Sequence, residues 1–166
     1  MLTVSNTSPI LNLAIIEHLE LLPQQFETVW IPQAVQEELR LDEDLPGSLM
    51  IRQTLADGWL RIKPIENVAF AQVLARELDR GEAEAIVLAI EMGADRILLD
   101  EREARRVAKA LRLSVTGVLG ILLSACKAKQ LSLPMTTIVD ALQEKAGFRL
   151  AGSLVEAVLQ ECGEGN

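Results

Sequence analysis

The segment Ile97-Leu98-Leu99-Asp100-Glu101 gives the most direct indication of this chain's architecture, because a short apolar run leads straight into two acids. Three consecutive large apolar residues are typical of a central strand that is buried on both faces of a parallel sheet. Asp100 then falls at the carboxyl end of that strand. Ligands bind at this end of the strands in open α/β sheets, so the segment predicts a parallel sheet with a site at its edge.

Short apolar runs of the same kind recur along the chain and alternate with helical patterns. Each run is bounded by Pro, Gly or Asp, and the predicted strands cover 2–4, 28–31, 59–62, 96–99 and 113–116. Helical patterns cover 9–22, 33–41, 48–57, 67–79, 82–93, 101–112, 117–130, 134–146 and 153–161. This alternation predicts an α/β fold in which helices cover both faces of a central parallel sheet.

Length and composition indicate one domain over residues 1–166. Of the 166 residues, 49% are hydrophobic, which is enough to build a sizeable core. The formal net charge of −8 argues against a broad, non-specific grip on nucleic acid. It leaves room for a nuclease, whose basic contacts can be local.

The sequence contains neither a membrane span nor a cysteine framework. The longest apolar stretch, Val118–Cys126, is too short to cross a bilayer, and the N-terminus lacks the basic and apolar regions of a signal peptide. Cys126 and Cys162 have no CxxC spacing and no partner histidines, which predicts idle thiols. We therefore expect a soluble, cytoplasmic protein with no membrane partner.

Polar residues mark three places where a helix is predicted to begin. Asn6 follows the first predicted strand, Glu82 opens a helical pattern, and Asp100 follows the central strand. Carboxylates gathered at one edge repel one another and are costly to desolvate, so we expect a cation between them.

Each acid also has a structural interpretation. Asp79 precedes Glu82 by three residues and Asp100 precedes Glu103 by three, as in a capping box. Ser8 before Pro9 likewise predicts a helix cap followed by the favoured first helical residue. Capping and ligand binding are both open to Asp100, because a carboxylate has two oxygens.

Helical periodicity separates the acids that face the sheet from those that do not. Glu82 shares its face with Ala85, Ile86, Ala89 and Ile90, so it is predicted to point over the strand ends. Glu84 is predicted to lie nearer the flank. By the same test Glu38 lies with Ala34, Val35 and Leu39 on the packing face, whereas Glu37 does not.

These residues together predict a metal site with oxygen ligands only. Its members are Asn6, Glu38, Glu82 and Asp100, which suit Mg²⁺ or Mn²⁺. Such an ion activates a water and stabilises charge on a phosphoryl oxygen during hydrolysis. Because Asn6 brings no charge, three carboxylates favour one divalent ion over two.

A basic stripe follows Asp100 along the next predicted helix, formed by Arg102, Arg105, Arg106, Lys109 and Arg112. The stripe is either a set of phosphate contacts or a solvated face paired with Glu101 and Glu103.

His18 is the only histidine and has no Ser or Cys constellation around it, so a catalytic triad is poorly supported. Stacking aromatics for single strands are scarce, with no Tyr, three Phe and two Trp.

With these residues in view, the sequence resembles the PIN-domain family, and more narrowly its VapC-like branch. Four segments carry the likeness in the family's order along the chain, namely Val4-Ser5-Asn6-Thr7-Ser8-Pro9-Ile10, Val35-Gln36-Glu37-Glu38-Leu39, Leu78–Ile86 and Leu98-Leu99-Asp100-Glu101. The run Val115-Thr116-Gly117-Val118-Leu119-Gly120 also looks like this branch.

The resemblance implies a three-layer α/β/α sandwich around a parallel sheet of four to five strands, a divalent-metal pocket and cleavage of single-stranded RNA. It places the family's four acids on Asn6, Glu38, Glu82 and Asp100, with Thr7 or Ser8 beside the metal. It also implies a homodimer and, for toxin members, a small antitoxin partner. Asn6 departs from the family's first Asp, which weakens the predicted metal affinity.

Three functional hypotheses follow. The first is a Mg²⁺- or Mn²⁺-dependent endoribonuclease of the toxin type, with low-ranked substrate contacts from Thr7, Ser8, Arg102, Arg105 and Arg106. The second is a PIN scaffold that binds RNA or a protein without cutting, motivated by Asn6. The third is a phosphohydrolase that acts on a small molecule at the same pocket.

Overall fold

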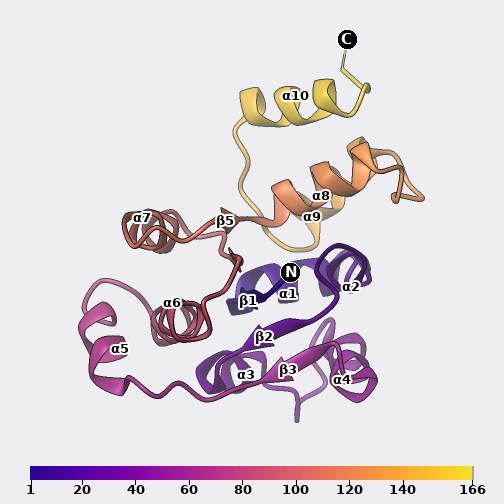
Figure 1. Cartoon of the computed structure of the whole chain (residues 1–166). Helices are drawn as coiled ribbons and strands as arrows, with labels where there is room; N and C mark the ends of the chain where they lie inside the picture. Colours follow the sequence, from indigo (N-terminus) through magenta and orange to yellow (C-terminus); the bar gives the residue numbers. More distant parts are fainter. Residues whose placement is uncertain (166) are drawn as a thin grey trace.

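The computed structural model describes residues 1–165, in which a five-stranded parallel sheet is covered by helices on both faces (Figure 1). All neighbouring strands pair in parallel, in the order β3-β2-β1-β4-β5. The strands are β1 (Thr3–Ser5), β2 (Val29–Ile31), β3 (Leu60–Ile62), β4 (Arg96–Leu98) and β5 (Val115–Thr116). All five predicted strands are confirmed, as is the three-layer α/β/α sandwich.

The helices of residues 1–165 lie close to the predicted ranges, except that the helix predicted over 67–79 ends at Leu74 and the one predicted over 9–22 is divided, as described below. They are α1 (Thr7–Ile15), α2 (Leu21–Phe26), α3 (Gln33–Leu39), α4 (Ser48–Asp57), α5 (Val68–Leu74), α6 (Arg80–Met92), α7 (Arg102–Ala110), α8 (Val118–Lys127), α9 (Met135–Glu144) and α10 (Gly152–Glu161). Within this part of the chain, no helix is both long enough and apolar enough to cross a bilayer.

Alternate residues of the strands supply the two apolar cores that hold the layers together. Val4 and Ile97 pack with α6 and α7 on one face, whereas Leu98 and Ile31 pack with α1, α2 and α8 on the other. Figure 1 shows α6 and α7 on the opposite side of the sheet from α1 and α2. These strand residues are fully buried, as expected for a sheet that is covered on both faces.

The strand order places the carboxyl ends of β1 and β4 at the point where the direction of winding reverses. β1 lies between β2 and β4, and Ser5 at its end is in register with Leu98 at the end of β4. In doubly wound sheets the crevice for a ligand opens at such a switch point. The polar residues that follow β1 and β4 therefore meet at one edge.

The single helix predicted over 9–22 is wrong, because the chain turns in the middle of it. α1 ends at Ile15, Glu17 adopts a positive φ of 61°, and α2 starts only at Leu21. The apolar periodicity continues across this turn, so the sequence pattern alone did not reveal it. His18 lies in the turn, is 8% exposed, and has its Nδ1 2.6 Å from the carbonyl oxygen of Ile16.

The start of α1 also differs from prediction. Asn6 is the N-cap residue and α1 begins at Thr7, so Ser8 lies inside the first turn and does not cap the helix. This shift leaves the Ser8 hydroxyl available for a partner outside its own helix.

The half-buried Cys126 and Cys162 are free thiols.

Candidate active site at the carboxyl ends of β1 and β4

Asn6 is fixed at the centre of this edge and keeps an unsatisfied oxygen. Its backbone N–H donates to the Leu98 carbonyl at 3.1 Å, which ties the end of β1 to β4. The side chain is 3% exposed, and Oδ1 is the only buried side-chain nitrogen or oxygen of residues 1–165 without a hydrogen-bond partner. A buried acceptor left in this state costs about 1–3 kcal/mol, so Asn6 presents an oxygen suited to a cation or a water.

Asp100 follows β4 and is held by groups from two helices, α1 and α8. Its Oδ1 accepts from the Val118 amide at 2.8 Å and its Oδ2 accepts from the Ser8 hydroxyl at 3.0 Å. Ser8 Oγ in turn accepts from the Asn12 amide at 3.0 Å. The carboxylate is therefore oriented by a fixed set of donors.

These contacts correct the predicted capping role of Asp100. It does not cap α7, whose N-cap residue is Glu101, and its oxygen instead satisfies the first amide of α8. Burial raises the pKa of Asp100 above its ordinary value, although the hydrogen bonds from Val118 and Ser8 and the nearby charge of Arg105 act in the opposite direction.

Glu82 has the capping role that the sequence predicted. It forms a capping box, in which Asp79 Oδ1 accepts from the Glu82 amide at 2.8 Å and Glu82 Oε2 accepts from the Asp79 amide at 3.1 Å. It is also 6% exposed. Burial raises the pKa of Glu82 against the opposing backbone hydrogen bond, and the negative charges of Asp79, Glu101 and Glu38 raise it further. Glu82 therefore lies among other acids.

The position of Glu38 on α3 differs from the predicted one. It is exposed and does not lie on the buried face of α3 with Val35. Its carboxylate accepts from the Thr7 hydroxyl and, at 3.0 Å, from the Gly81 amide. Because these donors belong to α1 and α6, Glu38 joins three helices at the strand ends.

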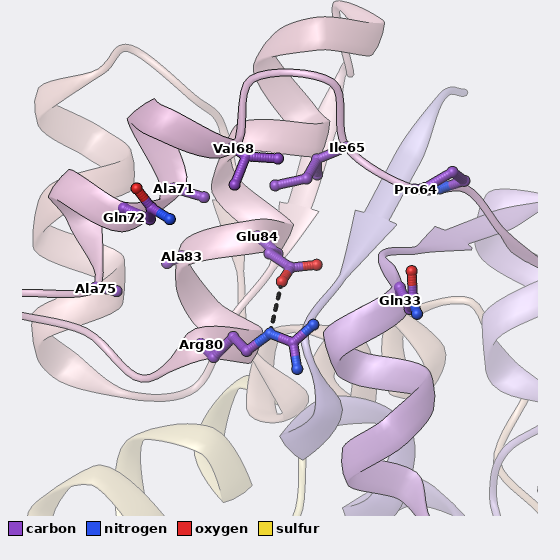
Figure 2. A pocket seen from close by; sticks show the side chains of 10 residues that line it. All are labelled: Gln33, Pro64, Ile65, Val68, Ala71, Gln72, Ala75, Arg80, Ala83 and Glu84. Carbon is purple, nitrogen blue, oxygen red and sulfur yellow. Dashed lines mark hydrogen bonds and ion pairs between the residues drawn. The ribbon is translucent and has the colours of Figure 1, made fainter.

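Glu84 is buried, so its predicted place on the flank of α6 is wrong. It is 8% exposed, and its carboxylate accepts from the Ala34 amide at 3.2 Å and from Arg80 Nε at 2.9 Å. Arg80 also pairs with Glu37 at 2.6 Å. Figure 2 shows Glu84 and Arg80 in a separate cavity of about 460 Å³ between α3, α5 and α6. The role that follows from these contacts is the attachment of α6 to the start of α3.

The basic stripe does not act as one surface. Arg105 Nη1 donates to the Leu99 carbonyl at 2.8 Å, beside Asp100. Arg106 instead pairs with Glu77 and Glu103 at the exposed surface, and Arg102 is exposed. α7 ends at Ala110, so Arg112 lies outside it. Only Arg105 of the predicted stripe is brought against the acidic edge.

The residues at this edge fit a hard divalent cation in their chemistry. The donors are carboxylate oxygens and the unsatisfied amide oxygen of Asn6. Within residues 1–165, no three side chains of His, Cys, Asp or Glu are grouped closely enough to hold a metal ion. Mg²⁺ commonly uses one or two carboxylates and keeps several waters, so such a grouping is not required for it.

Two residues near Asp100 were missed by the sequence reasoning. Phe148 and Arg149 line two cavities that also contain Asp100, of about 480 and 490 Å³. Glu101 lines the first of these cavities. An adjacent aromatic and basic residue in the connection between two helices was the signal that could have found the pair.

Comparison with known protein families identifies the family of this chain. The sequence model of a family described as a PIN domain matches residues 2–164. No curated protein matches the chain. The match covers nearly all of the sequence and includes every residue of the edge described above, so it confirms the predicted family resemblance. The narrower VapC-like branch stays a prediction.

Proposed function

Because the chain belongs to the PIN-domain family, we propose that it is a divalent-metal-dependent endoribonuclease of the VapC-like toxin type. The family supports a nuclease fold. The observation that carries the finer proposal is the buried, unsatisfied Oδ1 of Asn6, which is followed in the chain by Thr7, bound to Glu38, and Ser8, bound to Asp100. An oxygen in that position is explained by a cation or a coordinated water.

In this proposal Asn6, Glu82 and Asp100 would hold Mg²⁺ or Mn²⁺, and Glu38 would complete the acidic edge from α3. A divalent ion bound there would supply a water of lowered pKa and stabilisation of charge on a phosphoryl oxygen. Ser8 and the Val118 amide keep the Asp100 carboxylate in one orientation, and the Asp79 amide does the same for Glu82. Arg105 offsets part of the negative charge that an incoming phosphate meets.

The test is cleavage of structured and unstructured RNAs with Mg²⁺, with Mn²⁺ and with EDTA. Asp100→Asn and Glu82→Gln are expected to lower the rate on the order of 100-fold, as loss of a preorganised electrostatic group does. Glu103→Gln is the matched control, since Glu103 is an exposed acid in the first turn of α7. Metal-independent cleavage, or full activity of Asp100→Asn, would contradict the proposal. Turnover of a phosphodiester reporter without RNA cleavage would favour the small-molecule phosphohydrolase.

A second candidate function is a PIN scaffold that binds RNA or a partner protein without cutting, and Asn6 is the observation that favours it. Because Asn6 is neutral, the site has three carboxylates, whereas an Asp at position 6 would provide a fourth. Calorimetric titration with Mn²⁺ separates the two candidates. Absence of binding below about millimolar concentration favours the scaffold, whereas tighter binding favours the enzyme.

The toxin-type proposal also includes a homodimer, a small antitoxin and action in the cytoplasm. Expression of the chain alone should arrest growth if it is a toxin, and expression of the Asp100→Asn variant should not. Normal growth with an active wild-type enzyme would contradict the toxin part of the proposal and leave the ribonuclease part standing.

A further inference from the structure

We propose that the connection between α9 and α10, residues 145–151, is the substrate-binding wall of the active site. In this inference Arg149 binds a phosphate of single-stranded RNA, and Phe148 stacks on a base next to the scissile bond. The inference rests on the proposed ribonuclease function and adds how the substrate is held.

The first support is the position of this connection relative to Asp100. One cavity, of about 480 Å³, is lined by Ser8, Asn12 and Glu101, and the other, of about 490 Å³, by Arg105, Gly117 and Leu119. The residues that line both cavities are Asp100, Phe148 and Arg149. Figure 1 shows the connection passing close to the end of β5 and the start of α8. The pair therefore lies where two cavities meet at the proposed catalytic carboxylate.

The second support is that the backbone fixes the connection in this place. Gly147 adopts a positive φ of 67°, which turns the chain after α9 at no steric cost. The Phe148 amide then donates to the Leu142 carbonyl at 3.1 Å. Phe148 is half-buried and packs against the larger apolar core, so one side of its ring is anchored. A ring held in this way is suited to stacking, because it loses little further side-chain freedom when a base binds.

The third support is charge. A phosphate that approaches this edge meets Glu38, Glu82, Asp100 and Glu101, in a chain of net charge −8. Arg149 is exposed and makes no ion pair or side-chain hydrogen bond with any part of residues 1–165. Arg80 and Arg106, by contrast, are each paired with two carboxylates. Arg149 is therefore available for a bidentate contact with phosphate.

The two cavities differ in chemistry, which indicates how a nucleotide strand would lie across them. The one with Ser8 and Asn12 is mainly polar, whereas the one with Leu119, Leu150 and Leu154 is mainly apolar. A base stacked on Phe148 would enter the apolar cavity, and the next ribose and phosphate would lie in the polar one. The scissile phosphate would then lie between them, at Asp100.

The experiment measures binding of a fluorescent single-stranded RNA in EDTA, where cleavage does not interfere, together with Mn²⁺ affinity by calorimetry. Arg149→Ala and Phe148→Leu are each expected to raise the Kd for RNA roughly tenfold and to leave Mn²⁺ affinity unchanged. Leucine keeps the apolar packing while it removes the stacking face, and Phe148→Trp should restore binding. Arg76→Ala is the control, since Arg76 is also exposed but lies beyond the end of α5.

The outcomes separate this inference from the proposed function. Cleavage by the wild type with unchanged RNA affinity of both variants overturns the role of the connection and leaves the ribonuclease in place. Loss of Mn²⁺ binding in Arg149→Ala also overturns it, because the residue would then shape the metal site. A wild type that neither binds nor cleaves RNA overturns both.

Discussion

At the scale of single residues, Asn6 carries more of the chemistry than its neutral side chain suggests. Its amide oxygen is buried without a partner, at the position where a carboxylate would add a fourth charge to Glu38, Glu82 and Asp100. The protein thereby avoids adding a further negative charge to this edge when no cation is present. The same substitution weakens the attraction for the cation.

Asn6→Asp is therefore expected to bind Mn²⁺ roughly tenfold more tightly, since ligand charge tunes the affinity of such sites. Cleavage should rise with it. Without metal the variant should melt at a lower temperature than the wild type, because it buries an additional charge, and Mn²⁺ should reverse the loss. Calorimetry and thermal melts in EDTA and in Mn²⁺ check both parts. A loss of stability that Mn²⁺ does not reverse would show that the site holds no cation.

Gly81 offers a second test at this scale, because its missing side chain makes room for Glu38. A Cβ at this position would lie 2.5 Å from both carboxylate oxygens of Glu38. Those atoms are at the end of a flexible side chain, so Gly81→Ala should displace them and leave the fold intact. We expect a melting temperature close to that of the wild type and a clear loss of RNA cleavage.

Gly152→Ala is the matched control for this substitution. Gly152 also lies in the first turn of a helix, and a Cβ there would meet nothing within 4 Å. If Gly81→Ala cleaves RNA as well as Gly152→Ala does, the Glu38 carboxylate has no part in the reaction.

At the scale of elements, several helices begin with amides that are satisfied by acids from distant parts of the chain. The N-cap residues of α3, α8 and α9 are Pro32, Gly117 and Pro134, none of which makes a side-chain cap. Glu84, Asp100 and Glu164 respectively accept from the first-turn amides of these helices. Each such contact therefore fixes the start of a helix relative to a distant part of the chain as well as satisfying its amides.

Glu164 provides a prediction for stability at this scale. Burial alone would raise its pKa, but hydrogen bonds from the Thr136 and Met135 amides and the Thr136 hydroxyl outweigh that effect and lower it. A lowered pKa means that the contribution to stability is present at neutral pH and is lost as the pH falls below the ordinary value of 4.5.

We therefore expect Glu164→Gln to lower the free energy of unfolding at neutral pH by about 0.5 kcal/mol, as the loss of an exposed charged cap does. The difference from the wild type should shrink in acid. Urea denaturation at several pH values measures it, with Glu156→Gln on the exposed surface of α10 as the control. A difference that stays constant with pH would mean that the carboxylate charge is not involved.

At the scale of the whole molecule, the net charge of −8 limits how nucleic acid can be bound. Attraction must come from a few cationic side chains at the site, because the net negative charge of the chain repels the phosphate backbone. Arg105 and Arg149 are the two that line cavities with Asp100.

The salt dependence of RNA binding should accordingly be shallow. With two phosphate contacts, the slope of log K against log salt for a single strand is about −1.4. Arg149→Ala should halve that slope, while Arg76→Ala should not change it. Binding titrations from low to moderate salt measure the slope. A slope several times steeper would require a basic surface that this binding mode does not include.

Signals in the sequence predicted the features that depend on neighbouring residues. Apolar runs bounded by Pro, Gly or Asp located all five strands, and the spacing of Asp79 and Glu82 located a capping box, because both signals act within a few residues. The motifs that contain these acids also resemble those of the PIN-domain family, and the match to the family model confirms that resemblance.

The tertiary structure decided which distant groups those residues meet. Asp100 binds the start of α8, Glu38 reaches Thr7 and Gly81, Glu84 is buried against α3, and Phe148 and Arg149 lie beside Asp100. Helical periodicity places a side chain on a face but does not say what covers that face. That depends on how elements far apart in the chain pack together, which is why the strand ends could be predicted from the sequence and the contacts of the site could not.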